Sequence, residues 1–373
     1  MWIMYLLMLP FAVGICFYFK AFLKRMLENF GADVSKKYVN ILLWTASVCI
    51  GLVSLNLLRF GAVIILHVLV ISAVFQFVNF IIKKWAGDKY TKGFCVWKRI
   101  YGSGMIPLIL TAVLLVTGYF NMHSIVRTDY TVYTEKDVGD GYRVVLVADV
   151  HYGVSIEEDE LLEKCSEISA LDADMVILCG DIVDSGTDLK GMKTAFNAFG
   201  NINSKHGVFY VYGNHDRAHN HGGAFTDAEL EKAISDSDIR ILKDEVLDID
   251  DKLTLIGRED RGYTIGQSKR KSIYELTEGI DKGRFILTLD HQPTEYEENG
   301  NAGTDLLLSG HTHAGQLWPM NHIFNIFGIN DGVYGKIAID KDTDAIVTSG
   351  FAGWSYPVKT AAPAEYVVIE IKN

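Results

Sequence analysis

Residues 143–151 read Arg-Val-Val-Leu-Val-Ala-Asp-Val-His, an apolar run that ends at two side chains able to bind a metal ion. The apolar part, 143–148, predicts a strand buried on both faces in a layered α/β structure. Similar runs lie at 175–179, 207–212, 285–289, 305–309, 345–349 and 365–371. Polar helical stretches lie at 157–170, 188–200 and 226–236. We therefore expect an α/β domain whose sheets form a sandwich with helices outside.

Five of these strands lead directly into residues of the kinds that bind metals. In chain order, the residues are Asp149 and His151, Asp181, Asn214 and His215, His291, and His311 and His313. In open α/β sheets the carboxyl ends of the strands share one edge, where ligands bind. Taken singly, each motif has an ordinary explanation, such as a turn aspartate or a surface histidine. Because the pattern recurs on five strands, we expect one shared site.

Together the motifs resemble those of the calcineurin-like metallophosphoesterase superfamily. They are Asp149-Val150-His151, Gly180-Asp181-Ile182-Val183-Asp184, Gly213-Asn214-His215-Asp216, Asp290-His291 and Gly310-His311-Thr312-His313. The resemblance covers about residues 140–373 and implies a β-sandwich flanked by helices. One departure is Ala314, where relatives often carry glycine. The alanine affects how closely the backbone approaches the substrate, and it leaves metal ligation unchanged.

The resemblance also implies a role for each ligand. One metal ion would be held by Asp149, His151 and His313, the second by Asn214, His291 and His311, and both by Asp181 as a bridge. A bridging anion agrees with electrostatics, because two cations about 3.5–4 Å apart repel each other. Mixed His, Asp and Asn ligation favours Mn, Fe or Zn over Ca or Mg, and the sequence leaves the choice among those three open.

His215 is implied to lie beside the metals without binding them, where it would protonate the leaving alkoxide or stabilise the phosphoryl oxygens. Asp216 is expected to orient His215, and Asp184 to orient a metal ligand. For Asp184, a solvated loop carboxylate is the competing interpretation. The implied reaction is hydrolysis of a phosphoester, a diester in preference to a monoester, by in-line attack of a hydroxide that the metals activate.

Two other functions stay open. The first is a phosphomonoesterase or pyrophosphatase that acts on a soluble compound. The second is a non-catalytic membrane receptor or scaffold that keeps the fold and a metal site. Degenerate members of that kind should lack a ligand or the histidine of Gly-Asn-His-Asp, and this sequence contains them all. The receptor hypothesis is therefore the weaker of the two.

Charge is distributed unevenly along the chain. Residues 1–120 contain 12 Lys and Arg against 3 Asp and Glu, whereas residues 121–373 contain 23 against 43. The acidic second part repels polyanions at long range, so we expect no nucleic-acid partner. The five cysteines form no C-x-x-C pair, which disfavours a disulfide framework or a zinc ribbon.

The N-terminal third is predicted to anchor the protein in a membrane. Four apolar runs, at 2–19, 39–58, 61–82 and 102–120, each approach the ~20 residues that a spanning helix needs. We therefore divide the chain into an all-α transmembrane anchor of about four helices, a linker and a metallophosphoesterase domain, at 1–121, 122–140 and 141–373.

Basic residues predict how the anchor is oriented. They concentrate in segments 20–38 and 83–101, whereas the connection between the second and third runs holds only Arg59. By the positive-inside rule both basic segments are cytoplasmic, so a four-helix anchor places the catalytic domain on the extracytoplasmic side. We then expect a multi-pass protein whose partners are the lipid bilayer and a membrane-proximal or lipid-linked phosphoester. The oligomeric state is not indicated.

The segment 317–327, directly after the last metal motif, is apolar and aromatic. We expect it to pack over the core of the domain. The alternative is a lip that meets the bilayer or a lipid tail.

Overall fold

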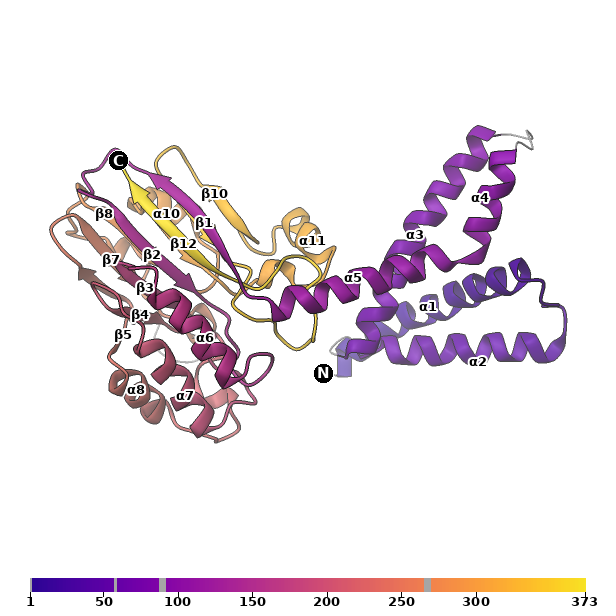
Figure 1. The fold of residues 1–373 in the computed structure, drawn as a ribbon, viewed down its shortest axis with the longest axis horizontal. Coiled ribbons are helices and arrows are strands. Elements are labelled where there is room, and N and C mark those ends of the chain that lie inside the picture. Colours follow the sequence, from indigo (N-terminus) through magenta and orange to yellow (C-terminus); the bar gives the residue numbers. More distant parts are fainter. Residues whose placement is uncertain (1, 57–58, 87–91, 265–269) are drawn as a thin grey trace. The chain divides into compact units, whose positions relative to one another are not determined.

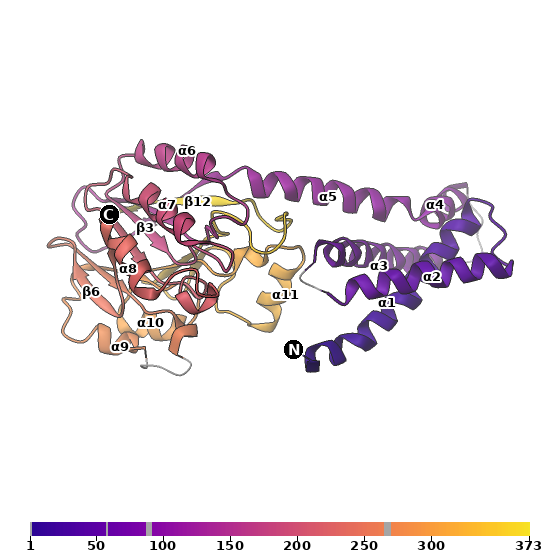
Figure 2. The same ribbon diagram turned by 90° about the horizontal axis from the view of Figure 1, so that it is seen from below.

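The computed structural model divides the chain into two compact units, Met1–Thr117 and Gly118–Asn373. It describes the chain except residues 1, 57–58, 87–91 and 265–269, and only the backbone at 2–8, 86, 92 and 263–264. The first unit consists of helices, and the second of two sheets with helices on their faces (Figures 1 and 2). Each unit is considered by itself below.

The helices of the first unit are α1 (Trp2–Asn29), α2 (Lys37–Ser54), α3 (Phe60–Ala86), α4 (Lys92–Ser103) and most of α5 (Met105–His123). Among the described residues, three helices are long and apolar enough to cross a membrane: Lys37–Ser54, Phe60–Trp85 and Met105–His123. They match the second, third and fourth predicted runs. The first run, 2–19, falls on α1 and begins among residues whose side chains lie outside the described part. Within the described residues the region therefore has five helices, three of them candidate spans, where about four spanning helices were predicted.

Helix α4 lies largely in the basic segment 83–101, for which no helix was predicted. It was missed because it is amphipathic, with Phe94, Val96 and Trp97 interspersed among basic residues, and a search for long apolar runs overlooks that pattern. Its packing is specific: the Trp97 indole donates a hydrogen bond to Asn79 at 3.1 Å.

The second unit contains two mixed six-stranded sheets, which confirms the predicted sandwich flanked by helices. The first sheet has the order β1 (Val126–Tyr133), β12 (Glu365–Lys372), β2 (Tyr142–Val147), β3 (Met175–Cys179), β4 (Val208–Val211), β5 (Ile239–Ile241). The second has the order β10 (Gly335–Ala338), β11 (Asp344–Val347), β9 (Leu306–Ser309), β8 (Phe285–Leu289), β7 (Leu253–Gly257), β6 (Glu245–Asp248). Strands β2 to β5 run parallel to one another, and so do β7, β8, β9 and β11.

Strand β1 lies in the segment 122–140 that we predicted to be a linker. It pairs in parallel with β12 along its whole length, from Val126 opposite Glu365 to Tyr133 opposite Lys372. It was missed because it is an edge strand with polar residues throughout, so it lacks an apolar run. Strands β5, β6, β7 and β10 were missed as well, and all of these except β7 are also edge strands.

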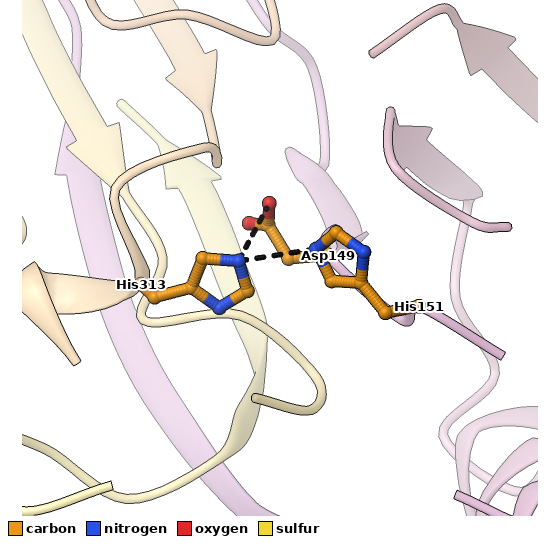
Figure 3. A group of neighbouring side chains, drawn as sticks. All are labelled: Asp149, His151 and His313. Carbon is orange, nitrogen blue, oxygen red and sulfur yellow. Dashed lines mark hydrogen bonds and ion pairs between the residues drawn. The ribbon is translucent and has the colours of Figure 1, made fainter. Parts of the chain in front are cut away.

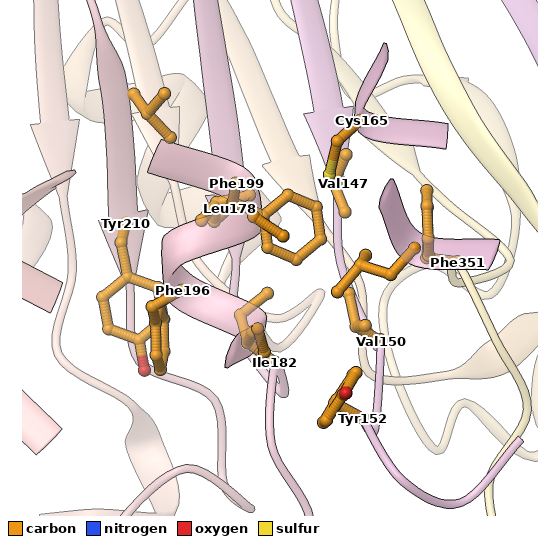
Figure 4. Packing of buried hydrophobic residues seen from close by; sticks show 14 of the residues in the cluster. Val147, Val150, Tyr152, Cys165, Leu178, Ile182, Phe196, Phe199, Tyr210 and Phe351 are labelled. Atoms are coloured by element: carbon orange, nitrogen blue, oxygen red, sulfur yellow. The ribbon is translucent and has the colours of Figure 1, made fainter. Parts of the chain in front are cut away.

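Successive side chains along the strands point to opposite faces of the sheet and so form two hydrophobic cores. Val144 and Leu146 of β2 face the second sheet, whereas Val145 and Val147 face the helices on the other side. That outer face is covered by α6 (Glu158–Ser169), α7 (Leu189–Gly200) and α8 (Asp227–Asp236). Figure 4 shows Phe196 and Phe199 of α7 packed against Leu178 and Tyr210 of the sheet. The three helices match the predicted stretches.

Shorter helices complete the unit. Helices α9 (Ile273–Leu276) and α10 (Tyr296–Ala302) pack on the second sheet, and three single-turn helices are η1 (Ala218–Asn220), η2 (Arg261–Thr264) and η3 (His313–Gly315). Helix α11 (Met320–Phe327) follows η3 and contains no buried residue. The expectation that segment 317–327 packs over the core is therefore wrong for its helical part.

Candidate metal centre

The carboxyl ends of five strands bring the predicted ligands together, as the strand-end pattern indicated. β2 leads to Asp149 and His151, β3 to Asp181, β4 to Asn214, β8 to His291, and β9 to His311 and His313. Within the described residues, three groups have ligand atoms within 4.8 Å of one another: Asp149, His151 and His313; Asp181, His291 and His311; and His151, Asp184 and His215. The cluster thus joins loops from both sheets.

The first group points its ligand atoms at one small region (Figure 3). The Nε2 atoms of His151 and His313 lie 3.1 Å apart. His313 Nε2 also lies 3.6 Å from Oδ1 of Asp149. Asp149 and His151 are fully buried, so this region is shielded from solvent. Two nitrogens and a carboxylate oxygen that converge in this way form a suitable set of metal ligands.

The second group surrounds the carboxylate of Asp181. Its Oδ2 lies 3.2 Å from His291 Nε2 and 3.9 Å from His151 Nε2, which belongs to the first group. Nearby, His311 Nδ1 lies 2.8 Å from Asn214 Oδ1. Asp181 is therefore the side chain that stands between the two groups.

Hydrogen bonds fix how one of these histidines is presented. His291 Nδ1 lies 2.8 Å from the carbonyl oxygen of Cys179, and only a protonated nitrogen can donate to a carbonyl. With Nδ1 bound to the backbone, Nε2 is the nitrogen that faces Asp181 and that could bind a metal ion. A backbone partner that fixes the tautomer in this way is common around metal-binding histidines.

The residues fit two divalent metal ions. Among the described residues, a buried ligand-facing nitrogen that finds no hydrogen-bond partner is His291 Nε2. Buried polar atoms are normally hydrogen-bonded, so an orphaned ligand atom needs an explanation, and a metal ion held between the ligands is one. The donors are imidazole nitrogens and carboxylate oxygens, the chemistry that borderline divalent ions prefer.

Burial controls protonation in the cluster. It lowers the pKa of His151 and of His311, each to about 4, so both imidazoles are neutral and able to bind a metal. Burial raises the pKa of Asp149 to about 7. Burial acts in the same direction on Asp181, but the neighbouring His291 and His151 hold the pKa of that carboxyl below its usual range. A buried carboxylate needs a nearby cation, and a metal ion supplies that charge.

The backbone at the ligands is unusual. Five predicted ligands have a positive φ: Asp149 (55°), His151 (43°), Asp181 (53°), His311 (71°) and His313 (49°). Residues other than glycine rarely adopt this left-handed conformation, and it costs of order 1–3 kcal/mol each. Such conformations cluster at functional sites, where surrounding contacts hold them in place.

His215 lies at the edge of the cluster with its side chain 24% exposed. Its Nδ1 lies 3.1 Å from Oδ1 of Asp184, whose Oδ2 lies 3.6 Å from His151 Nδ1. Burial acts to lower the pKa of His215, but the bond to Asp184 and the nearby Asp181 raise it above its ordinary value. Asp184 therefore contacts both a predicted ligand and the predicted acid, and it is not a solvated loop carboxylate.

The prediction that Asp216 orients His215 needs correction. The Asp216 carboxylate is fully buried and accepts hydrogen bonds from four backbone amides: Asp181 at 2.8 Å, Ile182 at 2.8 Å, Val183 at 3.2 Å and Gly213 at 2.7 Å. It thus ties the loop after β3 to the loop after β4. The sequence could not reveal these backbone contacts, because the pair His215-Asp216 reads the same whether the carboxylate binds the histidine or backbone amides.

Sequence reasoning also missed side chains that build the wall of the site. Gln316 accepts a hydrogen bond from the amide of Trp354 at 2.9 Å and donates to the Trp354 carbonyl at 2.8 Å. The Trp354 ring lies 5.6 Å from that of His215. The fully buried Lys359 donates to the carbonyls of Gly350 and Ala352, both at 3.2 Å. Gln316 ends the last motif, Gly310 to Gln316, but its partner was not predicted. Trp354 and Lys359 belong to no motif, so no signal in the sequence marked them.

Asp290, the residue before His291, has a structural partner instead of a metal. Its carboxylate accepts hydrogen bonds from Arg270 at 2.6 Å and Arg258 at 3.3 Å. Among the remaining histidines, His221 Nε2 lies 2.9 Å from the carbonyl of His215, so it supports the loop. His219 and His322 are exposed.

An α/β sandwich with His and Asp side chains gathered at one sheet edge defines a hydrolase of the dinuclear-metal class. Residues 142–315 match the family of calcineurin-like phosphoesterases. This matched region is therefore a calcineurin-like metallophosphoesterase domain, of a class of hydrolases that acts on ester bonds.

Relatives include bacterial and animal proteins. Over 72% of its length the chain is 24% identical to an uncharacterized metallophosphoesterase of Campylobacter jejuni, matching 69% of that protein. It is 27% identical, again over 72% of its length, to a transmembrane protein with metallophosphoesterase domain of Danio rerio, of which it spans 62%. A solved structure of a dimetal phosphatase from Danio rerio aligns with a TM-score of 0.37 and 12% identity over 55% of this chain and 86% of that one.

Proposed function

We propose that this protein hydrolyses a phosphodiester at a membrane surface with the help of two divalent metal ions. The observation that carries the proposal is the position of Asp181, whose Oδ2 lies 3.2 Å from His291 and 3.9 Å from His151. A carboxylate placed between two ligand groups is what a pair of mutually repelling cations requires.

In this proposal Asp149, His151 and His313 hold one ion, Asn214, His291 and His311 hold the other, and Asp181 serves both. When bound, a metal pair of this kind clamps a phosphoryl group, neutralises its charge and lowers the pKa of a coordinated water. Manganese, iron and zinc are the ions that suit these ligands.

The chain's own proton donor would be His215. Asp184 fixes its Nδ1, so its Nε2 is left to protonate the leaving oxygen or to donate a hydrogen bond to the phosphoryl group. The Trp354 ring beside it would limit which leaving groups fit. Asp216 acts on the scaffold, because its hydrogen bonds go to the backbone of the loops.

The preference for a membrane-proximal or lipid-linked substrate comes from the chain's organisation. Helix α5, a candidate span, ends at His123, and β1 of the catalytic unit begins at Val126. The short connection would keep the domain close to the bilayer. We retain residues 1–121 as anchor and 141–373 as catalytic domain, with β1 added from the segment between them.

The proposed orientation follows from the basic segments. If α1 serves as a fourth span, the positive-inside rule places segments 20–38 and 83–101 in the cytoplasm and the catalytic domain outside. An Asp140→Cys variant tests this placement, because Asp140 is exposed in the turn before β2. Labelling of intact cells by a membrane-impermeant maleimide supports it, and labelling by permeant reagents alone contradicts it. The parent for both is a variant whose exposed Cys49 and Cys95 are replaced by serine.

Activity is tested on the full chain purified in detergent. Elemental analysis should find two transition-metal ions per chain, and bis-p-nitrophenyl phosphate should be hydrolysed with Mn²⁺ added. Asp181→Asn should abolish turnover and reduce metal content. Asp236→Asn, which changes an exposed carboxylate on α8, should leave both unchanged.

The same samples separate the alternatives. Faster turnover of p-nitrophenyl phosphate than of the diester would favour a monoesterase. Bound metal with no turnover of either substrate would favour a receptor, and absence of metal would reject the proposed site.

A further inference from the structure

Helix α11 presents apolar side chains to solvent beside the metal centre. Ile326 is 77% exposed, Phe327 is 75% exposed, and Ile329 just beyond the helix is 56% exposed. The segment 317–330 contains no Asp, Glu, Lys or Arg, although the domain as a whole is rich in acidic residues. Scattered exposed apolar residues are ordinary, but a contiguous and uncharged group usually marks a binding surface.

This segment is connected to the end of the candidate span α5 through Thr360. The backbone amide of Trp318, two residues before α11, donates to Thr360 Oγ1 at 2.9 Å. The methyl group of Thr360 packs against Gly118 of α5. The two are so close that a Cβ atom at position 118 would lie 2.6 Å from Thr360 Cγ2. The amide of Lys359 donates to the Gly118 carbonyl at 2.8 Å. The segment that leads into α11 is therefore fixed beside the last turns of the candidate span α5.

The end of α5 itself carries the side chains expected where a helix leaves a bilayer. Tyr119 is 50% exposed and Phe120 is 61% exposed. Aromatic residues are enriched at the level of the lipid headgroups, where their rings meet both hydrocarbon and water. If Tyr119 and Phe120 lie at that depth, the neighbouring Trp318 and the start of α11 lie close to the same level.

We propose that α11 and Ile329 form a docking surface that inserts into the headgroup region of the bilayer. An interfacial helix needs an apolar face and little net charge on that face, and α11 has both. This lipid contact would continue the one expected of the candidate span α5.

Docking in this way places the metal centre at the membrane surface. The predicted metal ligand His313 lies in η3, only a few residues before α11. Between them, Gln316 donates a hydrogen bond to the carbonyl of Trp354, in the wall of the site. A phosphate in a lipid headgroup would then reach the site without leaving the bilayer. This consequence for the substrate rests on the proposed function, whereas the lipid contact itself does not.

The test measures lipid contact directly in the full chain. A parent variant has Cys16, Cys49 and Cys95 replaced by alanine, and the buried Cys165 and Cys179 stay. Ile326→Cys and, separately, Phe327→Cys are labelled with an environment-sensitive NBD fluorophore and placed in phosphatidylcholine nanodiscs. The matched control is Leu162→Cys on α6, which is also apolar and 48% exposed.

We expect nanodiscs made with brominated phosphatidylcholine to quench most of the fluorescence at 326 and 327 and to leave that at 162 almost unchanged. Quenching at 326 and 327 no greater than at 162 overturns the proposal. The proposal is also overturned if the NBD fluorescence at 326 and 327 changes with protein concentration but is not quenched by brominated lipid. That result would mean that a second copy of the chain covers the surface. Quenching in a protein that fails the turnover assay would reject the proposed function and leave the docking surface standing.

Discussion

Oδ1 of Asp184 lies 3.1 Å from Nδ1 of His215, so a buried carboxylate fixes the orientation of the one histidine at the edge of the metal centre. The pair resembles the arrangement by which a carboxylate holds an imidazole in a productive tautomer, with the opposite nitrogen left for the substrate. The Nε2 atom of His215 can therefore act on a leaving group while Nδ1 stays bound to Asp184.

This pair predicts how two variants behave. His215→Ala should lower kcat by about 10²–10⁴-fold, the usual contribution of a positioned acid, and should keep the metal ions. Asp184→Asn should lower kcat by about 10–100-fold, because its effect is exerted through the histidines it holds. Steady-state kinetics and elemental analysis on the same preparations measure both.

The double variant checks that the two residues act as a unit. If Asp184 works through His215, then adding Asp184→Asn to His215→Ala should cost little further rate. His219→Ala, a change at an exposed histidine in the same loop, is the control and should be neutral. Full activity of His215→Ala on diesters with poor leaving groups would show that His215 is not the acid.

Asp216 predicts a loss of stability. Asp216→Ala leaves buried amide donors of Asp181, Ile182, Val183 and Gly213 without their acceptor, and the cost should be about 3 kcal/mol or more. Thermal unfolding of the full chain in detergent should show a lower midpoint together with a loss of bound metal. Asp236→Ala on the surface of α8 should change neither; equal midpoints for the two variants would contradict the bracing role.

Metal removal should destabilise the catalytic unit, because ions that bind only the folded state stabilise it. Treatment with EDTA should lower the unfolding midpoint, and Mn²⁺ should restore it; the gain is about 2.7 kcal/mol at a hundredfold excess over Kd. In the Asp181→Asn variant, Mn²⁺ should raise the unfolding midpoint by less than it does in the wild-type chain. If neither EDTA nor Mn²⁺ changes the unfolding midpoint of the wild-type chain, the cluster does not hold metal.

A pair far from the metal centre predicts a pH dependence. The Tyr142 hydroxyl lies 2.8 Å from both oxygens of Asp250. Burial acts to raise the pKa of Asp250, but hydrogen bonds from the Lys252 amide and from Tyr142 bring it below its usual value. A lowered folded-state pKa adds stability above the unfolded value of about 3.9, and this stability is lost as pH falls through the folded value.

Tyr142→Phe should therefore cost about 1–2 kcal/mol near neutral pH. The difference in unfolding free energy from wild type should narrow as pH falls below the unfolded value of about 3.9, because the unfolded chain then binds a proton at Asp250 before the folded chain does. Urea unfolding followed at several pH values measures it. A difference that stays constant down to pH 3 would mean that the lost stability comes from packing and not from the hydrogen bond to the carboxylate.

The central strands and the ligands could be predicted because each carries its own local signal. Met175–Cys179 is buried along its whole length, and Asp181 follows it directly. Strand β1 had no such signal, since its stability comes from pairing with β12. Tertiary geometry decides which partner a polar side chain binds. For this reason Asp216 contacts backbone amides and not the expected His215, and Asp184 contacts His215 in addition to the expected metal ligand. The contacts of Gln316 and of Lys359 could not be predicted for the same reason.

The order of strands in the first sheet has a kinetic consequence. β1 and β2 are consecutive in the chain and could form a hairpin, yet β12 lies between them, parallel to β1 and antiparallel to β2. The sheet can close only when segments from opposite ends of the catalytic unit meet, and such non-local pairing makes folding slow. A premature β1–β2 hairpin would have to open before β12 could enter. Refolding of this unit should therefore be limited by the search for β12, and during that search the strand edges that later become the middle of the sheet remain free to pair with other chains.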